Sequence, residues 1–254
     1  MKRILKIGMD VHTTNYTLCA MEPIIGEDDR VFATIKVTPD YKNILMFIEN
    51  LRMKLGLNDE YDIQCGYEAG CLGYSLYNQL TAAGVKCVIL APTTMLTPQG
   101  VRIKTDMRDA YMIAQCLSYG GYHAVYIPTE ADDSVKEYLR MRNDHKLALK
   151  KIKQQINAFC IRHGFCYDGT KWTLAHLNWL KKLEITNELY RETLDEYMAS
   201  YEEQEAKIER YDKRIEEIAE QTKYYDKVKK LKCFLGIKTH TALSLIVENG
   251  DFER

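Results

Sequence analysis

The feature that most constrains the fold is a long run of large side chains at helical spacing in the second half of the chain. From Tyr190 to Ile218 these side chains recur in alternating steps of four and three residues, with one polar position at Gln204. Such steps place every member on one stripe of an α-helix, and their seven-residue repeat is typical of a coiled-coil seam. The members are Tyr190, Leu194, Tyr197, Tyr201, Gln204, Ile208, Tyr211, Ile215 and Ile218.

A second, weaker stripe of the same spacing runs from Tyr138 to Phe159. Gly164 and residues 167–170, which read Tyr-Asp-Gly-Thr, separate the two stripes. Glycine and short turn-forming segments of this kind end helices. We therefore expect residues 129–228 to form a coiled-coil arm of two long helices, paired either with each other or with a second subunit.

The first 128 residues have a different period and predict an α/β domain. The expected order is three strands, a helix, a strand, a helix, a strand and a final helix. This is the element order of the ribonuclease-H-like fold, in which helices cover a mixed sheet. The expected elements are strands at 4–10, 16–20 and 31–37, a helix at 41–55, a strand at 61–68, a helix at 72–83, a strand at 86–90 and a helix from 106 to about 120.

The formal net charge of −1 conceals a strong separation of charge along the chain. Residues 136–162 carry eight basic and two acidic side chains, whereas residues 184–220 carry thirteen acidic and five basic ones. A basic segment within a neutral total is typical of a nucleic-acid-binding surface, although these side chains can also face solvent or pair with the acidic helix. The candidate contacts are Lys146, Lys150, Lys151, Lys153 and Arg162.

The chain has eight cysteines, and their spacing favours buried free thiols over a zinc or redox site. No two of them form a C-x-x-C pair, and most lie within apolar segments, where cysteine packs as a small hydrophobic residue. The sequence has no run of about 18 apolar residues and no signal-peptide pattern at its start. We therefore expect a protein of the cytoplasm without a membrane span.

Four carboxylates from three predicted elements form the candidate catalytic site. Asp10 and Glu68 each close a strand, while Asp106 and Asp109 are three residues apart at a helix start and share one helix face. If they converge, they provide the all-oxygen ligand set that Mg²⁺ or Mn²⁺ prefers, and such sites cleave phosphodiesters. The alternative for each acid is an ordinary role at a strand end, or as a helix cap for Asp106.

Basic and histidine side chains flank this set of acids. His12 lies two residues after Asp10, where it can form a local hydrogen bond or take part in proton transfer. Arg102, Lys104 and Arg108 surround the pair of aspartates in the last helix. They can hold the scissile phosphate of a nucleic acid or balance the local negative charge.

Near the end of the chain, residues 234–243 read like the turn of a helix-hairpin-helix. A glycine turn followed by a helix N-terminus offers backbone N–H groups to a phosphate. The sequence ends soon afterwards, at Arg254, which leads us to expect a fragment of a longer protein.

Three motifs occur together: Gly-Met-Asp-Val-His at 8–12, Tyr-Glu-Ala-Gly at 67–70 and Lys-Thr-Asp-Met-Arg-Asp-Ala at 104–110. In order and approximate spacing they resemble the DEDD transposase family of insertion sequences, which includes the Piv-type DNA invertases. Residues 235–243, followed by Gly-Asp-Phe at 250–252, resemble the opening of that family's second conserved domain. The resemblance extends over nearly the whole chain.

This resemblance implies a RuvC-like nuclease domain in which Asp10, Glu68, Asp106 and Asp109 are the ligands of Mg²⁺ or Mn²⁺. It further implies DNA cleavage and strand exchange guided by a structured RNA, assembly as dimers or tetramers, and a C-terminal transposase domain with a serine nucleophile. That serine follows the Gly-Asp-Phe segment in the family, so residues 229–254 are expected to be the truncated start of this domain. The family's Gly-Ile-Gly turn is Gly-Ile-Lys at 236–238 here, which weakens the expected phosphate contact.

Three other functions compete with recombination. A resolvase or exonuclease on the same fold would use water as the nucleophile. An actin-like or sugar-kinase ATPase also begins with a strand that ends in aspartate, but its Asp-x-Gly turn is missing here, because residues 10–13 read Asp-Val-His-Thr. The third alternative is a non-catalytic module that binds guide RNA and dimerises.

Overall fold

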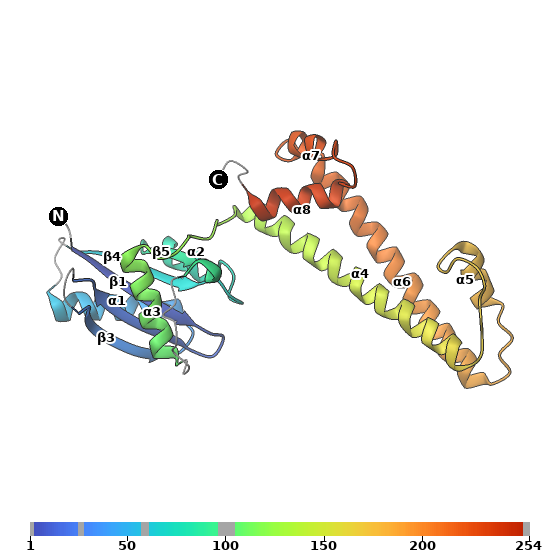
Figure 1. Cartoon of the computed structure of the whole chain (residues 1–254), viewed down its shortest axis with the longest axis horizontal. Coiled ribbons are helices and arrows are strands. Elements are labelled where there is room, and N and C mark those ends of the chain that lie inside the picture. Colours follow the sequence, from blue (N-terminus) through green and yellow to red (C-terminus); the bar gives the residue numbers. More distant parts are fainter. Residues whose placement is uncertain (1–2, 25–27, 57–60, 96–104, 251–254) are drawn as a thin grey trace. The chain divides into compact units, whose positions relative to one another are not determined.

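The computed structural model describes residues 3–24, 28–56, 61–95 and 105–250 of the chain. They divide into two compact units, the first ending at Ile127 and the second beginning at Pro128 (Figure 1). The elements of the first unit are β1 (Arg3–Val11), β2 (Tyr16–Glu22), β3 (Arg30–Val37), α1 (Tyr41–Leu55), β4 (Tyr61–Glu68), α2 (Ser75–Ala82), β5 (Lys86–Leu90), the 3-10 turn η1 (Pro92–Thr94) and α3 (Asp106–Tyr119). Those of the second unit are α4 (Glu130–Arg162), α5 (Leu174–Lys181), α6 (Glu188–Ala219), α7 (Tyr225–Leu231) and α8 (Thr239–Asn249).

The strands of the first unit form one mixed sheet in the order β3-β2-β1-β4-β5. β1 pairs antiparallel with β2, and β2 pairs antiparallel with β3. β4 pairs parallel with β1, and β5 pairs parallel with β4. An antiparallel three-stranded meander extended by parallel strands is the ribonuclease-H-like arrangement, so the fold class expected from the element order is confirmed.

Helices cover both faces of this sheet. On one face, Ile44 of α1 and Leu80 of α2 belong to the same buried cluster as Ile7 and Met9 of the central strand. On the other face, α3 packs across β1, β2 and β4 (Figure 1). A strand covered on both faces needs apolar or small residues, which β1 provides from Ile7 to Met9.

Gly8 sets the distance between α3 and the sheet. A Cβ atom at this position would lie 2.1 Å from the carbonyl oxygen of Ala110 and 2.3 Å from the amide nitrogen of Ala114. Only glycine allows two backbones to approach so closely. Gly66 plays a related part in β4, because a Cβ there would lie 2.8 Å from the side chain of Leu117. The helix therefore rests directly on the sheet.

The start of α2 differs from the sequence expectation. The helix begins at Ser75 rather than at Leu72. Gly73 has a φ of 54°, in the left-handed region, so the backbone cannot enter a right-handed helix before that residue. The last glycine before the helix, rather than the first apolar residue, sets this boundary.

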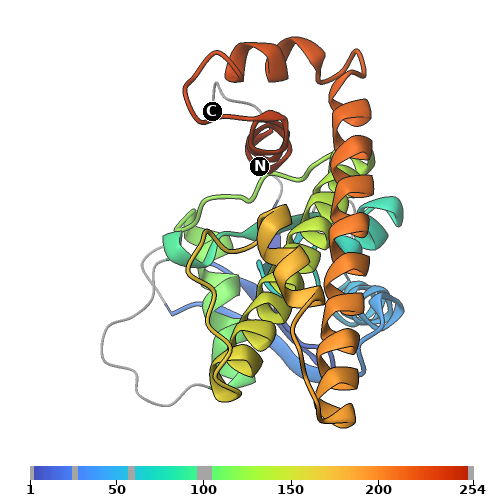
Figure 2. The same cartoon turned by 90° about the vertical axis from the view of Figure 1, so that its right-hand side faces the viewer.

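In the second unit α4 and α6 pack against each other and run side by side in both views (Figures 1 and 2). The two predicted stripes therefore cover each other within one chain, which is the first of the two pairings left open by the sequence. One apolar cluster, with Leu149, Phe159 and Leu194 among its members, lies near the tip beside α5. A helix at α5 was not predicted, because no element was assigned to the residues that follow the break at 167–170.

A polar layer interrupts the apolar contacts between α4 and α6. Arg142 donates two hydrogen bonds to Asp212, at 2.7 and 2.9 Å. Nδ1 of His145 lies 2.9 Å from Oε1 of Gln204, the polar member of the stripe. Buried or half-buried polar pairs at a coiled-coil seam specify one register of the two helices.

The other apolar cluster of the second unit joins the base of the arm to α7 and α8. Val135 of α4, Ile215 of α6, Val228 of α7 and Leu243 of α8 are among its buried members. The described part of residues 229–250 thus packs with the arm. A third domain beginning at residue 229 stays a prediction. Within the described ranges, no helix has the length and apolarity needed to cross a bilayer.

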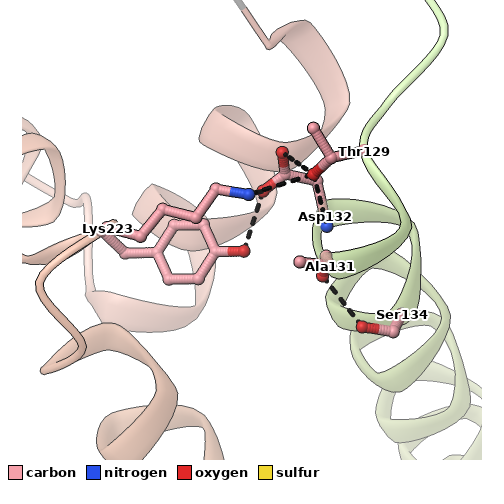
Figure 3. A network of polar contacts seen from close by, with 6 residues as sticks. Thr129, Ala131, Asp132, Ser134 and Lys223 are labelled. Carbon is pink, nitrogen blue, oxygen red and sulfur yellow. Dashed lines mark hydrogen bonds and ion pairs between the residues drawn. The ribbon is translucent and has the colours of Figure 1, made fainter.

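Figure 3 shows the polar contacts between the start of α4 and the segment before α7. Asp132 accepts hydrogen bonds from the hydroxyl groups of Thr129 and Tyr224, both at 2.8 Å, and forms an ion pair with Lys223 at 2.8 Å. Burial alone would raise the pKa of Asp132, but the hydrogen bonds from Lys223, Tyr224 and Thr129 outweigh it and lower the pKa. The network therefore favours the ionised carboxylate.

We expect Gly8→Ala to destabilise the first unit by about 1–3 kcal/mol or more, because the added methyl group must push α3 away from β1. Gly70→Ala is the matched control, since its Cβ would meet nothing closer than 3.9 Å. Thermal unfolding of both variants measures the difference. Equal melting temperatures would show that α3 does not depend on this contact.

A second expectation concerns acid. A lowered pKa in the folded state means that Asp132 stabilises the fold above its unfolded pKa of about 3.9, and that this stabilisation is lost as the pH falls through the folded pKa. The melting temperature of Asp132→Asn should therefore lie below that of the wild type at neutral pH, and the gap should close in acid. A gap that is constant from pH 7 to pH 3 would contradict this assignment.

Candidate metal centre

A row of polar side chains crosses the sheet beside the N-terminus of α3. The strand register places Asp10 of β1 opposite Thr17 of β2, and Thr17 opposite Lys36 of β3. On the other side, Met9 lies opposite Tyr67, so the next position in each parallel strand pairs Asp10 with Glu68. Side chains directly opposite each other in a sheet point to the same face. Lys36, Thr17, Asp10 and Glu68 therefore share one face.

That face is the one covered by α3. Asp10 lies two residues after Gly8 and Glu68 two residues after Gly66, and side chains two apart in a strand point the same way. Both glycines contact α3. The sheet thus delivers the two carboxylates to the helix side.

α3 contributes the remaining acids from its first turn. Thr105 is the N-cap residue, and its side chain accepts a hydrogen bond from the backbone N–H of Arg108 at 3.4 Å. Asp106 and Asp109 are the acidic residues of this turn. Because Thr105 already caps the helix, capping does not account for Asp106. One ligand atom each from Asp10, His12 and Asp106 lie within 4.8 Å of one another.

Asp10 has an unusual environment for a carboxylate. Its Oδ2 atom is buried and accepts no well-directed hydrogen bond from any described residue. Nε2 of His12 lies 3.2 Å away, at ion-pair distance. Burial raises the pKa of Asp10, the charge of His12 opposes this, and the charges of Asp109 and Asp106 raise the pKa further. A buried carboxylate oxygen that has His12 at 3.2 Å but no well-directed donor among the described residues is a costly arrangement unless a cation binds there.

Asp106 has the opposite environment. Its Oδ2 atom accepts a hydrogen bond from Nζ of Lys36 at 2.7 Å. This bond, together with the positive charge of Lys36, lowers the pKa of Asp106. Two neighbouring carboxylates thus have pKa values shifted in opposite directions, which is a pattern of functional sites.

The predicted acids are brought together to different degrees. Asp10 and Asp106 lie within one group of ligand atoms, and Asp109 is near enough for its charge to act on Asp10. Glu68 ends the adjacent strand on the same face, has an exposed side chain and is not part of the group found among the described residues. Arg108 is exposed in α3. Arg102 and Lys104 lie outside the described residues.

Two residues of this site were missed by the sequence. Lys36 was assigned to the third strand but not to the site. Thr17 is buried next to Asp10, and its hydroxyl group has no hydrogen-bond partner among the residues that the structure describes. Their place follows only from the register of β1, β2 and β3, which residue spacing alone does not determine. The alternation of Lys36 with Ile35 and Val37 in the third strand was the available signal.

The basic residues of α4 divide into two groups. Lys146, Lys150, Lys151 and Arg162 are exposed. Lys153 instead forms an ion pair with Glu205 of α6 at 3.2 Å and lies over the rings of Trp172 and Tyr201. The acidic helix therefore neutralises Lys153, and the other four remain available to a ligand of opposite charge.

Comparisons with known proteins agree with the sequence motifs. The family model DEDD_Tnp_IS110, described as a transposase, matches residues 7–160. The transposase for insertion sequence element IS1533 of Leptospira borgpetersenii is 34% identical over 257 residues, which cover 100% of this chain and 72% of that protein. A Sinorhizobium fredii protein also named as a transposase is 34% identical over 131 residues, 51% of this chain and 34% of its own length.

Solved structures similar to the chain are those of RuvC from Thermus thermophilus. One is 12% identical with a TM-score of 0.33, and the other, in complex with a Holliday junction substrate, is 13% identical with a TM-score of 0.32. Each alignment covers 48% of this chain and 99% of the RuvC chain. The assignment to a family rests on the family model and on the relative that matches over the whole of this chain. The chain belongs to the DEDD transposase family of the IS110 type.

Proposed function

We propose that the first unit carries a divalent-cation-dependent centre that cleaves DNA strands during transposition, with Asp10, Glu68, Asp106 and Asp109 as its ligands. The observation that carries this proposal is the buried Oδ2 atom of Asp10, which has no well-directed hydrogen bond among the described residues, beside the carboxylate of Asp106. Carboxylate oxygens are the donors that Mg²⁺ and Mn²⁺ prefer. The residues present therefore fit such an ion.

When bound, the cation would supply charge for the phosphate oxygens and a lowered pKa for an attacking hydroxyl group. The protein side chains have separate tasks. Asp10 and Asp106 would be the central ligands of the ion, and Asp109 and Glu68 would complete its set of carboxylates. His12, at 3.2 Å from Asp10, can hold a proton next to this carboxylate. α3 and β1 keep these groups in a fixed geometry through Gly8.

DNA is the proposed substrate because the relatives are named as transposases of mobile DNA. The exposed lysines of α4 would add phosphate contacts. A finer proposal is that the complete reaction is RNA-guided strand exchange in an oligomer, with a serine nucleophile from outside residues 1–254. It is supported by the family resemblance alone. Hydrolysis by water at the same centre is the alternative. The reaction products distinguish the two, because strand exchange yields joined DNA strands and hydrolysis yields only cut ones.

We expect Asp10→Asn and Asp106→Asn each to abolish Mn²⁺ binding to the full chain and to lower the protein's strand-cleavage activity about a hundredfold or more. Loss of the ion-binding carboxylate is the reason in both cases. Asp10→Asn should leave the melting temperature unchanged or raised, because it removes a charge that burial disfavours. Asp62→Asn, which breaks an exposed ion pair with Lys86 on β5, is the control. Unaltered Mn²⁺ binding in Asp10→Asn would refute the proposed centre.

The basic face of α4 has its own test. Lys150→Glu combined with Lys151→Glu should weaken binding to duplex DNA and reduce the slope of log affinity against log salt concentration by about two. Lys207→Glu with Lys213→Glu makes the same change in net charge on α6, where both lysines already pair with glutamates. An equal loss of binding in both double variants would point to net charge rather than to a surface on α4.

A further inference from the structure

The carboxylates of the candidate metal centre already have basic side chains of the protein as neighbours. Nζ of Lys36 lies 2.7 Å from Oδ2 of Asp106, and Nε2 of His12 lies 3.2 Å from Oδ2 of Asp10. Lys36 reaches Asp106 from a different element, the edge strand β3. Its ammonium group therefore lies against an oxygen that the proposed function assigns to a divalent cation.

We propose that Lys36 is a built-in counter-ion of this centre, whose ammonium group must leave Asp106 when a divalent cation binds. The inference rests on the proposed function, because it concerns the same carboxylate. It goes beyond the proposed function, because Lys36 would change the affinity of the centre for the cation without being a ligand. Lys36 acts on the centre only through its charge beside Asp106.

Several features of the Lys36–Asp106 pair fit displacement better than a permanent structural role. The side chains are 53% and 39% exposed, so water can replace each partner. Exposed ion pairs contribute little to the free energy of folding. The lysine side chain has a flexible four-carbon stem and a compact charge, which can swing away at little energetic expense. Asp106 is the carboxylate at ion-pair distance from Lys36 among the described residues.

Simple electrostatics gives the direction of the effect. An ammonium group and a divalent cation repel each other when they share one carboxylate, so Lys36 must lower the affinity of the centre for the cation. Removing the charge of Lys36 should therefore tighten cation binding. If Lys36 merely held Asp106 in place, its removal would loosen binding instead. The two roles predict changes of opposite sign.

The experiment is a Mn²⁺ titration of the full chain at constant ionic strength, with free Mn²⁺ measured by its electron paramagnetic resonance signal. Lys36→Met keeps the aliphatic stem and removes the charge, and we expect it to bind Mn²⁺ about three- to tenfold more tightly than the wild type. Lys36→Arg keeps the charge and should stay close to the wild type. Lys42→Met removes an exposed lysine of α1 and controls for the change in net charge.

Unchanged or weaker Mn²⁺ binding by Lys36→Met would overturn the counter-ion role, as would equal tightening by Lys42→Met. The failure of the proposed function gives a different result. If Asp10→Asn abolishes Mn²⁺ binding while Lys36→Met leaves it unchanged, the centre stands and only the role of Lys36 falls. If the wild type and Asp10→Asn bind Mn²⁺ alike, both proposals fail. Melting temperatures of the variants show that each is folded.

Discussion

The close approach of α3 to the central strand at Gly8 is the constraint on which the first unit depends. A backbone-to-backbone contact leaves α3 almost no freedom to slide, since any Cβ at Gly8 would occupy the space of the helix backbone. The same contact has a functional side. Asp10 follows Gly8 by two residues in β1, and Asp106 is the first residue of α3, which packs against Gly8. One packing interaction therefore determines both how α3 lies on the sheet and how far apart the two carboxylates are.

The pKa values of the two carboxylates differ because their elements place them in different environments. Asp10 lies in the central strand under the helix, where burial raises its pKa. Asp106 lies at the exposed start of α3, where Lys36 lowers its pKa. A cation bound by both would offset the burial of the Asp10 carboxylate and compete with the ammonium group of Lys36 for Asp106. Neighbouring carboxylates with opposite pKa shifts are common at functional sites and uncommon in regions that serve only stability.

Much of this arrangement could be predicted from the sequence, and the remainder required the strand register. Element order gave the ribonuclease-H-like fold because each strand and helix has its own apolar period. The proximity of Asp10 and Asp106 could be predicted because both fall at element ends, whereas their role as ligands stays a prediction. Lys36 could not, since a lysine in a strand joins a site only through the pairing of β2 with β3, where a register shift occurs between Ala20 and Met21. The pairing of Lys153 with Glu205 likewise depends on how two helices align, which the stripes alone leave open.

The polar layer of the arm has a mechanical consequence. α4 contains 33 residues, which corresponds to a rod about 50 Å long. If α4 slid by one heptad along α6, Arg142 would lose both hydrogen bonds to Asp212 and His145 would lose Gln204. A seam of uniform leucines would tolerate such slippage far better. The hairpin of α4 and α6 is therefore rigid along its length, and the distance between its tip and its base is fixed.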